Sequence, residues 1–217
     1  KEQRGYITPQ EFNLFANQAQ MSIFEQYFYD LNQFLRVPGN NTAYADMVNL
    51  LEEKISTFEK SNATVGGGSS LPSNLYKLQQ VQWLNSIEGK YYNAEYVDRK
   101  TWLQMQTVPL VRPTDKKLIY IRNSSGISVI GDNSKQTNIT CNYIAKPKNP
   151  NWTYVVVDKK ALYNPNAADH QHFELHESEQ TELVTRVLAL AGITLKDTNL
   201  YQIASNQTNS QTQQQKQ

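Results

Sequence analysis

The chain has 217 residues, with 21 Lys and Arg against 20 Asp and Glu, so its net charge is +1. This length favours one compact domain, or one domain with extensions. The near-neutral charge excludes a broadly basic nucleic-acid binder, because affinity for phosphate depends on clustered Lys and Arg. The single cysteine, Cys141, excludes an internal disulfide framework and a metal site built from several cysteines.

The unusual feature of the composition is its amide content. Asn and Gln make up about a fifth of the chain, and there are 13 Tyr. Such a surface suits packing against other protein, although an AT-rich genome would raise the Asn content as well. The longest apolar stretch, residues 184–193, is interrupted by Thr185 and Arg186. It falls short of the roughly 20 residues of a membrane-spanning helix, so we expect no membrane partner.

Residues 1–60 are predicted to form a helical hairpin. The capping box Thr8-Pro9-Gln10-Glu11 begins the first helix, and Pro38-Gly39 ends it. Its apolar residues recur at three- and four-residue spacing and form an arc wider than one stripe, which predicts burial on two sides, within one chain or between subunits. A second helix, with apolar residues from Tyr44 to Phe58, follows after a short turn.

Residues 61–70 (SNATVGGGSS) are predicted to be a flexible loop, because three consecutive glycines are costly to order. Residues 71–177 are predicted to be mainly β, with short strands rich in β-branched and aromatic residues and a hairpin loop at 123–126. Residues 90–105 are ambiguous and suit a strand followed by a short helix near Asp98–Leu103.

The last part of the chain returns to helix over residues 178–204. Ser178 is the expected cap, Gly192 the expected end, and a short helix starts at Asp197 or Thr198. Residues 205–217 are a low-complexity tail without apolar side chains. The predicted fold class is therefore α+β: an N-terminal helical hairpin, a small antiparallel β region and C-terminal helices.

The three histidines lie in one stretch, residues 170–176. On a strand, His172, Glu174 and His176 would share a face and form a zinc-type ligand set. Alternate residues of a strand stand roughly 6.5 Å apart, however, so three of them cannot reach one ion at about 2.1 Å. His172 and His176 remain weak metal candidates, and the preferred interpretation is a polar strand face; we expect no cofactor.

Other residue groups allow weaker interpretations. Cys141 alternates with apolar residues on a strand, which favours a buried structural thiol over a nucleophile. Basic residues gather weakly in two places, and four of them are candidates for facing DNA or an acidic partner: Lys116, Lys117, Lys146 and Lys148. Two other functions stay open: a glycan- or surface-binding module that uses Trp and Tyr, and a metal-dependent hydrolase that uses His170, His172 and His176.

Three stretches carry a family resemblance: GYITPQEFNLFANQAQ at residues 5–20, YIAKPKNPNW at 143–152, and FELHESE at 173–179 followed by ELV at 182–184 and LALAGI at 188–193. In this order they resemble virion structural proteins of tailed phages that infect Bacteroidetes-type hosts, including crAss-like phages. Those proteins are similar to the head-to-tail adaptor or tail-tubular ring proteins of short-tailed phages.

The resemblance implies a structural protein, not an enzyme, that is assembled in the host cytoplasm into the virion neck or tail. It implies a homo-oligomeric ring, twelvefold in known relatives, that adjoins the portal and neighbouring tail rings and surrounds the DNA channel with non-specific contacts. The wide apolar arcs of the helices would then pack on neighbouring subunits. The candidate interface residues are Phe12, Phe24, Phe28, Leu183 and Val187.

Overall fold

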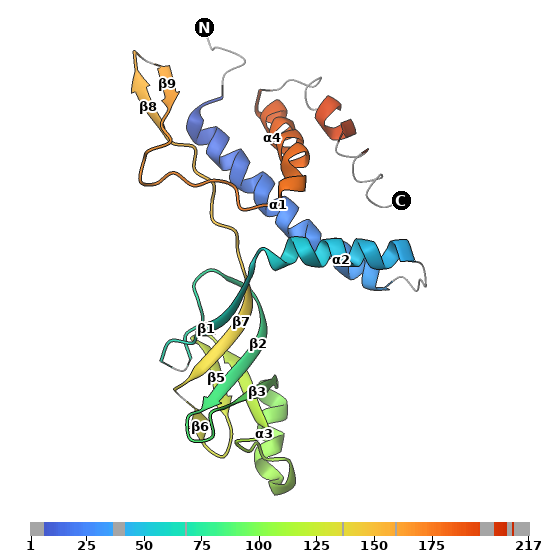
Figure 1. Cartoon of the computed structure of the whole chain (residues 1–217), viewed down its shortest axis with the longest axis vertical. Coiled ribbons are helices and arrows are strands. Elements are labelled where there is room, and N and C mark those ends of the chain that lie inside the picture. The colour runs from blue at the N-terminus through green and yellow to red at the C-terminus, as the bar shows by residue number, and fades with distance from the viewer. Residues whose placement is uncertain are drawn as a thin grey trace. The chain divides into compact units, whose positions relative to one another are not determined.

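The chain folds as two compact units, shown in the computed structural model of Figure 1. The structure describes residues 7–36, 42–67, 69–135, 137–158, 160–195, 202–207 and 210. Unit 1 combines Lys1–Thr57 with Pro147–Gln217, and unit 2 is the intervening segment Phe58–Lys146. Among the helices described, none is both long enough and apolar enough to span a bilayer.

The first helix of unit 1, α1 (Pro9–Arg36), begins at the predicted capping box. The Thr8 N–H donates to Glu11 Oε2 at 2.8 Å, and the Glu11 N–H donates to Thr8 Oγ1 at 3.2 Å. These reciprocal bonds satisfy two backbone groups that the first helical turn leaves free, and they confirm the predicted start. The predicted stop at Pro38-Gly39 lies outside the described residues.

Two further helices pack on α1, namely α2 (Thr42–Ser56) and α4 (Gln180–Leu195). The predicted cap of α4, Ser178, instead lies in the short 3-10 turn η2 (Glu177–Glu179), whose start is capped by the His176 ring. The helix also continues past its predicted end at Gly192. Glycine inside a helix costs only about 1 kcal/mol, which packing against α1 can offset.

The predicted fold class is wrong in its β part. Instead of a small antiparallel region, unit 2 contains a curled seven-stranded mixed sheet in the order β1-β7-β2-β3-β4-β5-β6, and unit 1 contains a separate two-stranded sheet, β8-β9. In the large sheet β3 and β4 are parallel and all other neighbouring strands are antiparallel. The strands are β1 (Glu59–Thr64), β2 (Leu75–Asn85), β3 (Lys90–Tyr96), β4 (Leu118–Asn123), β5 (Gly126–Ile130), β6 (Ser134–Lys135), β7 (Ile139–Ala145), β8 (Tyr154–Val157) and β9 (Lys160–Tyr163).

The sheet has more strands than predicted because its edge strands have no apolar pattern. β1 pairs only with β7, is exposed at nearly every position, and lies partly within the predicted flexible loop 61–70. The opposite edge, β6, has only two residues. Edge strands tolerate polar side chains along their whole length, so hydrophobic periodicity does not identify them.

A helical crossover joins the two parallel strands of the sheet. It consists of α3 (Arg99–Thr107) and the 3-10 turn η1 (Pro109–Val111), between β3 and β4. Parallel neighbours need such a connection, because a tight turn only reverses the chain. The sequence was ambiguous here: it suited a strand followed by a short helix, and it gave no sign of the parallel pairing. No residue of α3 or η1 is buried, which is unusual for a crossover helix.

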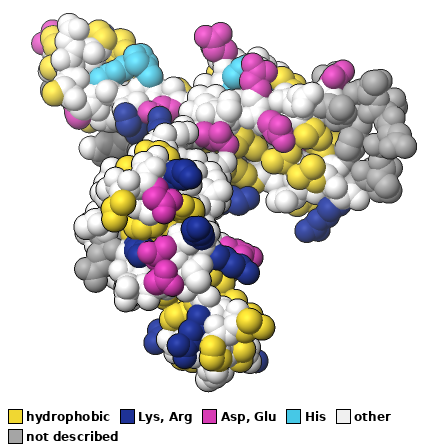
Figure 2. Space-filling model, turned by 60° about the horizontal axis from the view of Figure 1, so that its bottom comes forward, with side chains coloured by type: hydrophobic (Ala, Val, Ile, Leu, Met, Phe, Trp, Pro, Cys, Tyr) yellow, Lys and Arg dark blue, Asp and Glu magenta, His cyan; other side chains and the backbone are white. Residues whose placement is uncertain are grey.

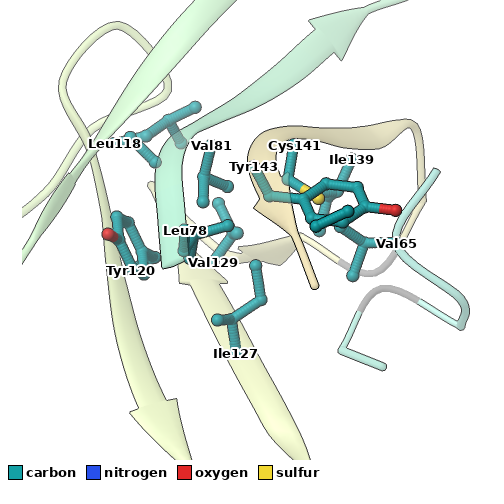
Figure 3. Close-up of a cluster of buried hydrophobic side chains, with 12 residues drawn as sticks. Val65, Leu78, Val81, Leu118, Tyr120, Ile127, Val129, Ile139, Cys141 and Tyr143 are labelled. Carbon is teal, nitrogen blue, oxygen red and sulfur yellow. The ribbon is translucent and has the colours of Figure 1, made fainter. Parts of the chain in front are cut away.

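The core of unit 2 fills the inside of the curled sheet (Figure 3). Val81 and Ile127 are fully buried in it. The chain after β1 crosses this core and donates from Val65 N–H to Ile139 O at 3.0 Å, while Ser69 O accepts from Ile127 N–H at 2.9 Å. Only glycine fits at position 126, because a Cβ there would lie 1.8 Å from Ser69 O and φ is 138°.

Candidate functional site

The three segments that carry the family resemblance meet in unit 1, at a site that we name the motif junction: Asn13 and Gln20 of α1, with Lys148, Asn151, Trp152 and Glu174. Asn13 Nδ2 donates to Asn151 Oδ1 at 2.9 Å and to Trp152 O at 3.1 Å. The Trp152 N–H donates back to Asn13 Oδ1 at 2.8 Å. One amide side chain therefore satisfies both backbone polar groups of Trp152.

Gln20 holds the other two segments in the same way. Its Nε2 donates to Lys148 O at 2.8 Å, and its Oε1 accepts from Glu174 N–H at 3.0 Å. Its side chain is fully buried, with an exposed fraction of 0%. Asn13 and Gln20 are seven residues apart, or about two helical turns, so they point to the same side of α1. Neither amide was assigned a role from the sequence, although their seven-residue spacing already placed them on one side of the helix.

Aromatic side chains surround the junction next to the β8-β9 ribbon. The Trp152 ring stacks with Tyr154 and Tyr163 at centroid distances of 5.8 and 6.0 Å, and Phe12 meets it edge-on at 6.3 Å. A pocket of about 420 Å³ opens beside Trp152 and is lined by Ile7, Pro9, Phe12, Trp152 and Ala161. A second pocket of about 150 Å³ lies between this cluster and His170 and His172. The apolar lining of the first pocket suits an apolar side chain, whereas the second pocket is also lined by Asn, Gln and His side chains.

The predicted histidine strand does not form. Residues 172–176 have no strand conformation, and Gln171 makes only an isolated bridge with Asn151. The His170 ring contacts His172 edge-on at 4.5 Å, and its Nε2 lies 3.0 Å from the Tyr163 hydroxyl. His176 instead interacts with Ser178. Among the described residues no three His, Cys, Asp or Glu side chains come together as a metal site.

Unit 1 also contains buried charges. Lys54 of α2 forms an ion pair with Glu179 at 2.5 Å, and Lys54 also lies 5.7 Å from the centroid of the Tyr27 ring. Arg186 pairs with Glu182 one turn earlier in α4. Burial, together with the Glu179 and Glu182 carboxylates, raises the pKa of Tyr27 far above its ordinary value. Arg186 also donates to Ser22 and Gln26 of α1, so this network links α2 and α4 to α1.

Cys141 lies inside unit 2, as predicted, with Ile139 and Tyr143 on the inward side of β7. Burial raises the pKa of the thiol, which lowers its thiolate fraction and its reactivity.

The five candidate interface residues do not form an exposed set. Phe24 is completely buried within unit 1, so it is not available to another subunit. Phe12, Phe28, Leu183 and Val187 are half-buried. The large hydrophobic side chains that the described part of unit 1 exposes were not among these candidates: Leu14, Tyr29, Leu35, Leu50, Val155, Val156, Val157, Leu162, Tyr163, Phe173, Val184, Leu188 and Ile203. Helical periodicity predicts which side of a helix is buried, but it does not predict which residues at the edges of that side stay exposed.

The four candidate basic residues are all exposed, but they divide between the two units. Lys116, Lys117 and Lys146 belong to unit 2, and Lys148 belongs to unit 1, where it pairs with Glu174 at 3.6 Å. The net charge also differs between the two units. Unit 2 has eleven Lys and Arg against six Asp and Glu, net +5, whereas unit 1 has ten against fourteen, net −4.

The chain was also compared with known proteins. No protein-family model matches the chain, and a search of curated proteins finds no significant match.

Proposed function

We propose that this protein is a structural subunit of a tailed-phage virion, a ring-forming component of the head-tail connector that surrounds the DNA channel. The observation that carries the proposal is the motif junction. The three stretches that resemble connector proteins are far apart in the sequence, yet Asn13 and Gln20 bind them to one helix through five hydrogen bonds. Residues that carry the resemblance are thus the ones that organise unit 1.

The exposed apolar side chains support an assembled state. Large hydrophobic residues are exposed on all three long helices of unit 1 and on both strands of the β8-β9 ribbon. Isolated two-stranded ribbons are marginally stable in water, and large exposed apolar patches are uncommon on monomers. Neighbouring subunits, the portal or an adjacent tail ring would cover these surfaces. The net charge of unit 2 suits non-specific contact with packaged DNA, with Lys116, Lys117 and Lys146 as the candidate contacts.

Sedimentation velocity and negative-stain electron microscopy of the purified full chain test the proposal, together with mass spectrometry of purified virions. The expected result is a discrete ring of many copies, and the protein as a stoichiometric virion component. A chain that stays monomeric at every concentration and is absent from virions would contradict the proposal.

A second function, glycan or surface binding, is favoured by one observation: the 420 Å³ pocket beside Trp152. Sugar rings stack on aromatic faces, but they also need polar partners, and the lining side chains that the structure describes are apolar. The variant Ala161→Trp fills the pocket and leaves the contacts of Trp152 in place. Glycan-array binding by the wild type that is lost in this variant would favour the second function, and no binding by either would reject it.

A further inference from the structure

The crossover α3-η1, residues Arg99–Arg112, stands out because it is ordered without being buried. We name it the basic arm. Asp98 caps its start by accepting from the Thr101 N–H, and Arg112 Nη2 donates to Gln106 O at 3.2 Å, which ties η1 back to α3. A crossover helix ordinarily packs on its sheet. In the basic arm no side chain is fully buried: Thr101, Trp102 and Met105 are half-buried and the others are exposed.

The exposed side chains of the basic arm combine apolar and positive groups. Leu103, Val108, Leu110 and Val111 are exposed, and Leu110 reaches an exposed fraction of 95%. The segment contains Arg99, Lys100 and Arg112 but no acidic residue. In Figure 2, hydrophobic and basic side chains lie side by side at the lowest part of unit 2, which α3 occupies in Figure 1. Bare phosphate would complement the charge but would leave the four aliphatic side chains in water, so the surface fits an acidic protein.

The same chain offers a surface of the opposite kind on α2. Its exposed residues include Asp46, Leu50, Glu52 and Glu53, and we name these four the acidic face. Asp46, Leu50 and Glu53 follow one helical side at spacings of four and three residues. On α3, Arg99 and Lys100 precede Leu103 by four and three residues, so both lie one helical turn before it. Each surface therefore has charges of one sign beside a leucine, and the two signs are opposite.

We infer that the basic arm of one copy docks on the acidic face of a second copy, so that subunits join head to tail. The inference rests on the proposed ring function and names the contact that would build the ring. Two different, complementary patches on one chain give a heterologous contact, which closes into a ring when the rotation between copies permits it. The division of net charge into +5 and −4 favours the same pairing at longer range.

Oxidative cross-linking of two single-cysteine variants of the full chain, Leu103→Cys and Leu50→Cys, tests the contact. Cys141 does not compete because it is buried. We expect a disulfide-linked heterodimer from the mixture, formed at least about tenfold more than from Leu50→Cys mixed with the control Ile87→Cys. Ile87 is more exposed than Leu103, at 96% against 56%, but it lies outside the basic arm. Equal yields in the two mixtures would overturn the inference.

Charge reversal provides an independent test without cysteines. Arg99→Glu/Lys100→Glu should weaken self-association about tenfold or more, and Glu52→Lys/Glu53→Lys should do the same. When these two double variants are mixed, their reversed surfaces again carry opposite charges, so association should return. Unchanged self-association in both double variants would overturn the inference. So would an Arg99→Glu/Lys100→Glu variant that loses binding to a DNA duplex but self-associates like the wild type. If the charge-reversed variants still form rings, the inferred contact is wrong but the proposed function is not contradicted. If the wild-type chain is a monomer that is absent from virions, both the contact and the proposed function are wrong.

Discussion

The two units of this protein are stabilised by different kinds of interaction. Every buried polar or charged side chain of the described residues lies in unit 1: Gln20, Asp30, Lys54, Thr153, Glu179, Glu182 and Thr185. The main core of unit 2 consists of hydrophobic side chains inside a curled sheet. A hydrophobic core tolerates changes of similar volume, whereas a buried polar network depends on every partner. Unit 1 should therefore be more sensitive to single polar replacements, and unit 2 to the loss of volume.

The largest effect is expected from Lys54→Met. This change leaves Glu179 buried without its cation, which costs about 3–5 kcal/mol of unfolding free energy. Urea unfolding followed by hydrogen exchange should place the loss in unit 1. In the double variant Lys54→Met/Glu179→Leu most of the stability should return, because no charge stays buried. A loss below about 1 kcal/mol in the single variant would show that the pair is hydrated.

The matching change in unit 2 is Leu118→Ala, at a side chain that is 1% exposed. Deleting a buried leucine costs about 3 kcal/mol through lost transfer free energy and the cavity that remains. Hydrogen exchange should lose protection in β3, β4 and β5, while the helices of unit 1 keep theirs. Leu110→Ala, at an exposed site on η1, serves as the control and should change stability by less than about 0.5 kcal/mol. Equal loss of protection in both units would contradict the expectation that the two units unfold separately.

A smaller effect is expected from Gln20→Leu, which keeps the side-chain volume but removes both hydrogen bonds of Gln20 in the motif junction. Lys148 O and Glu174 N–H lose their partner, at a cost of about 2 kcal/mol. Thermal unfolding measures the cost, and Gln18→Leu, at an exposed position of the same helix, is the matched control. A similar loss from both variants would mean that the junction has no special role.

The smallest effect concerns pH at the start of α1. Hydrogen bonds from the Thr8 backbone and hydroxyl lower the pKa of Glu11. A lowered folded-state pKa means that this contribution to stability is present above the unfolded pKa and is lost as pH falls through the folded one. Thr8→Ala should move the NMR-measured pKa of Glu11 back up. Asp98 in unit 2, whose pKa is lowered by a hydrogen bond from Thr101, should not respond.

The contrast between the units also explains what could be predicted. The capping box at Thr8–Glu11, the hairpin at 123–126 and the buried face of β7 follow from local rules, and the structure confirms each of them. The size of the sheet could not be predicted, because its polar edge strand β1 has no pattern and its pairing with β7 spans about eighty residues. The histidine stretch failed for a related reason: the Glu174 N–H inside it donates to Gln20 of α1 instead of to a neighbouring strand.

By itself the sequence determined where most of the regular elements lie, since caps, turns and apolar spacing act within a few residues along the chain. Only the tertiary structure decided that β3 and β4 run parallel, that Phe24 is buried while Leu110 is exposed, and that three distant motifs share one site. Those outcomes depend on contacts between residues far apart in the chain. The same periodic pattern is compatible with a covered or an uncovered face until the neighbouring elements are in place.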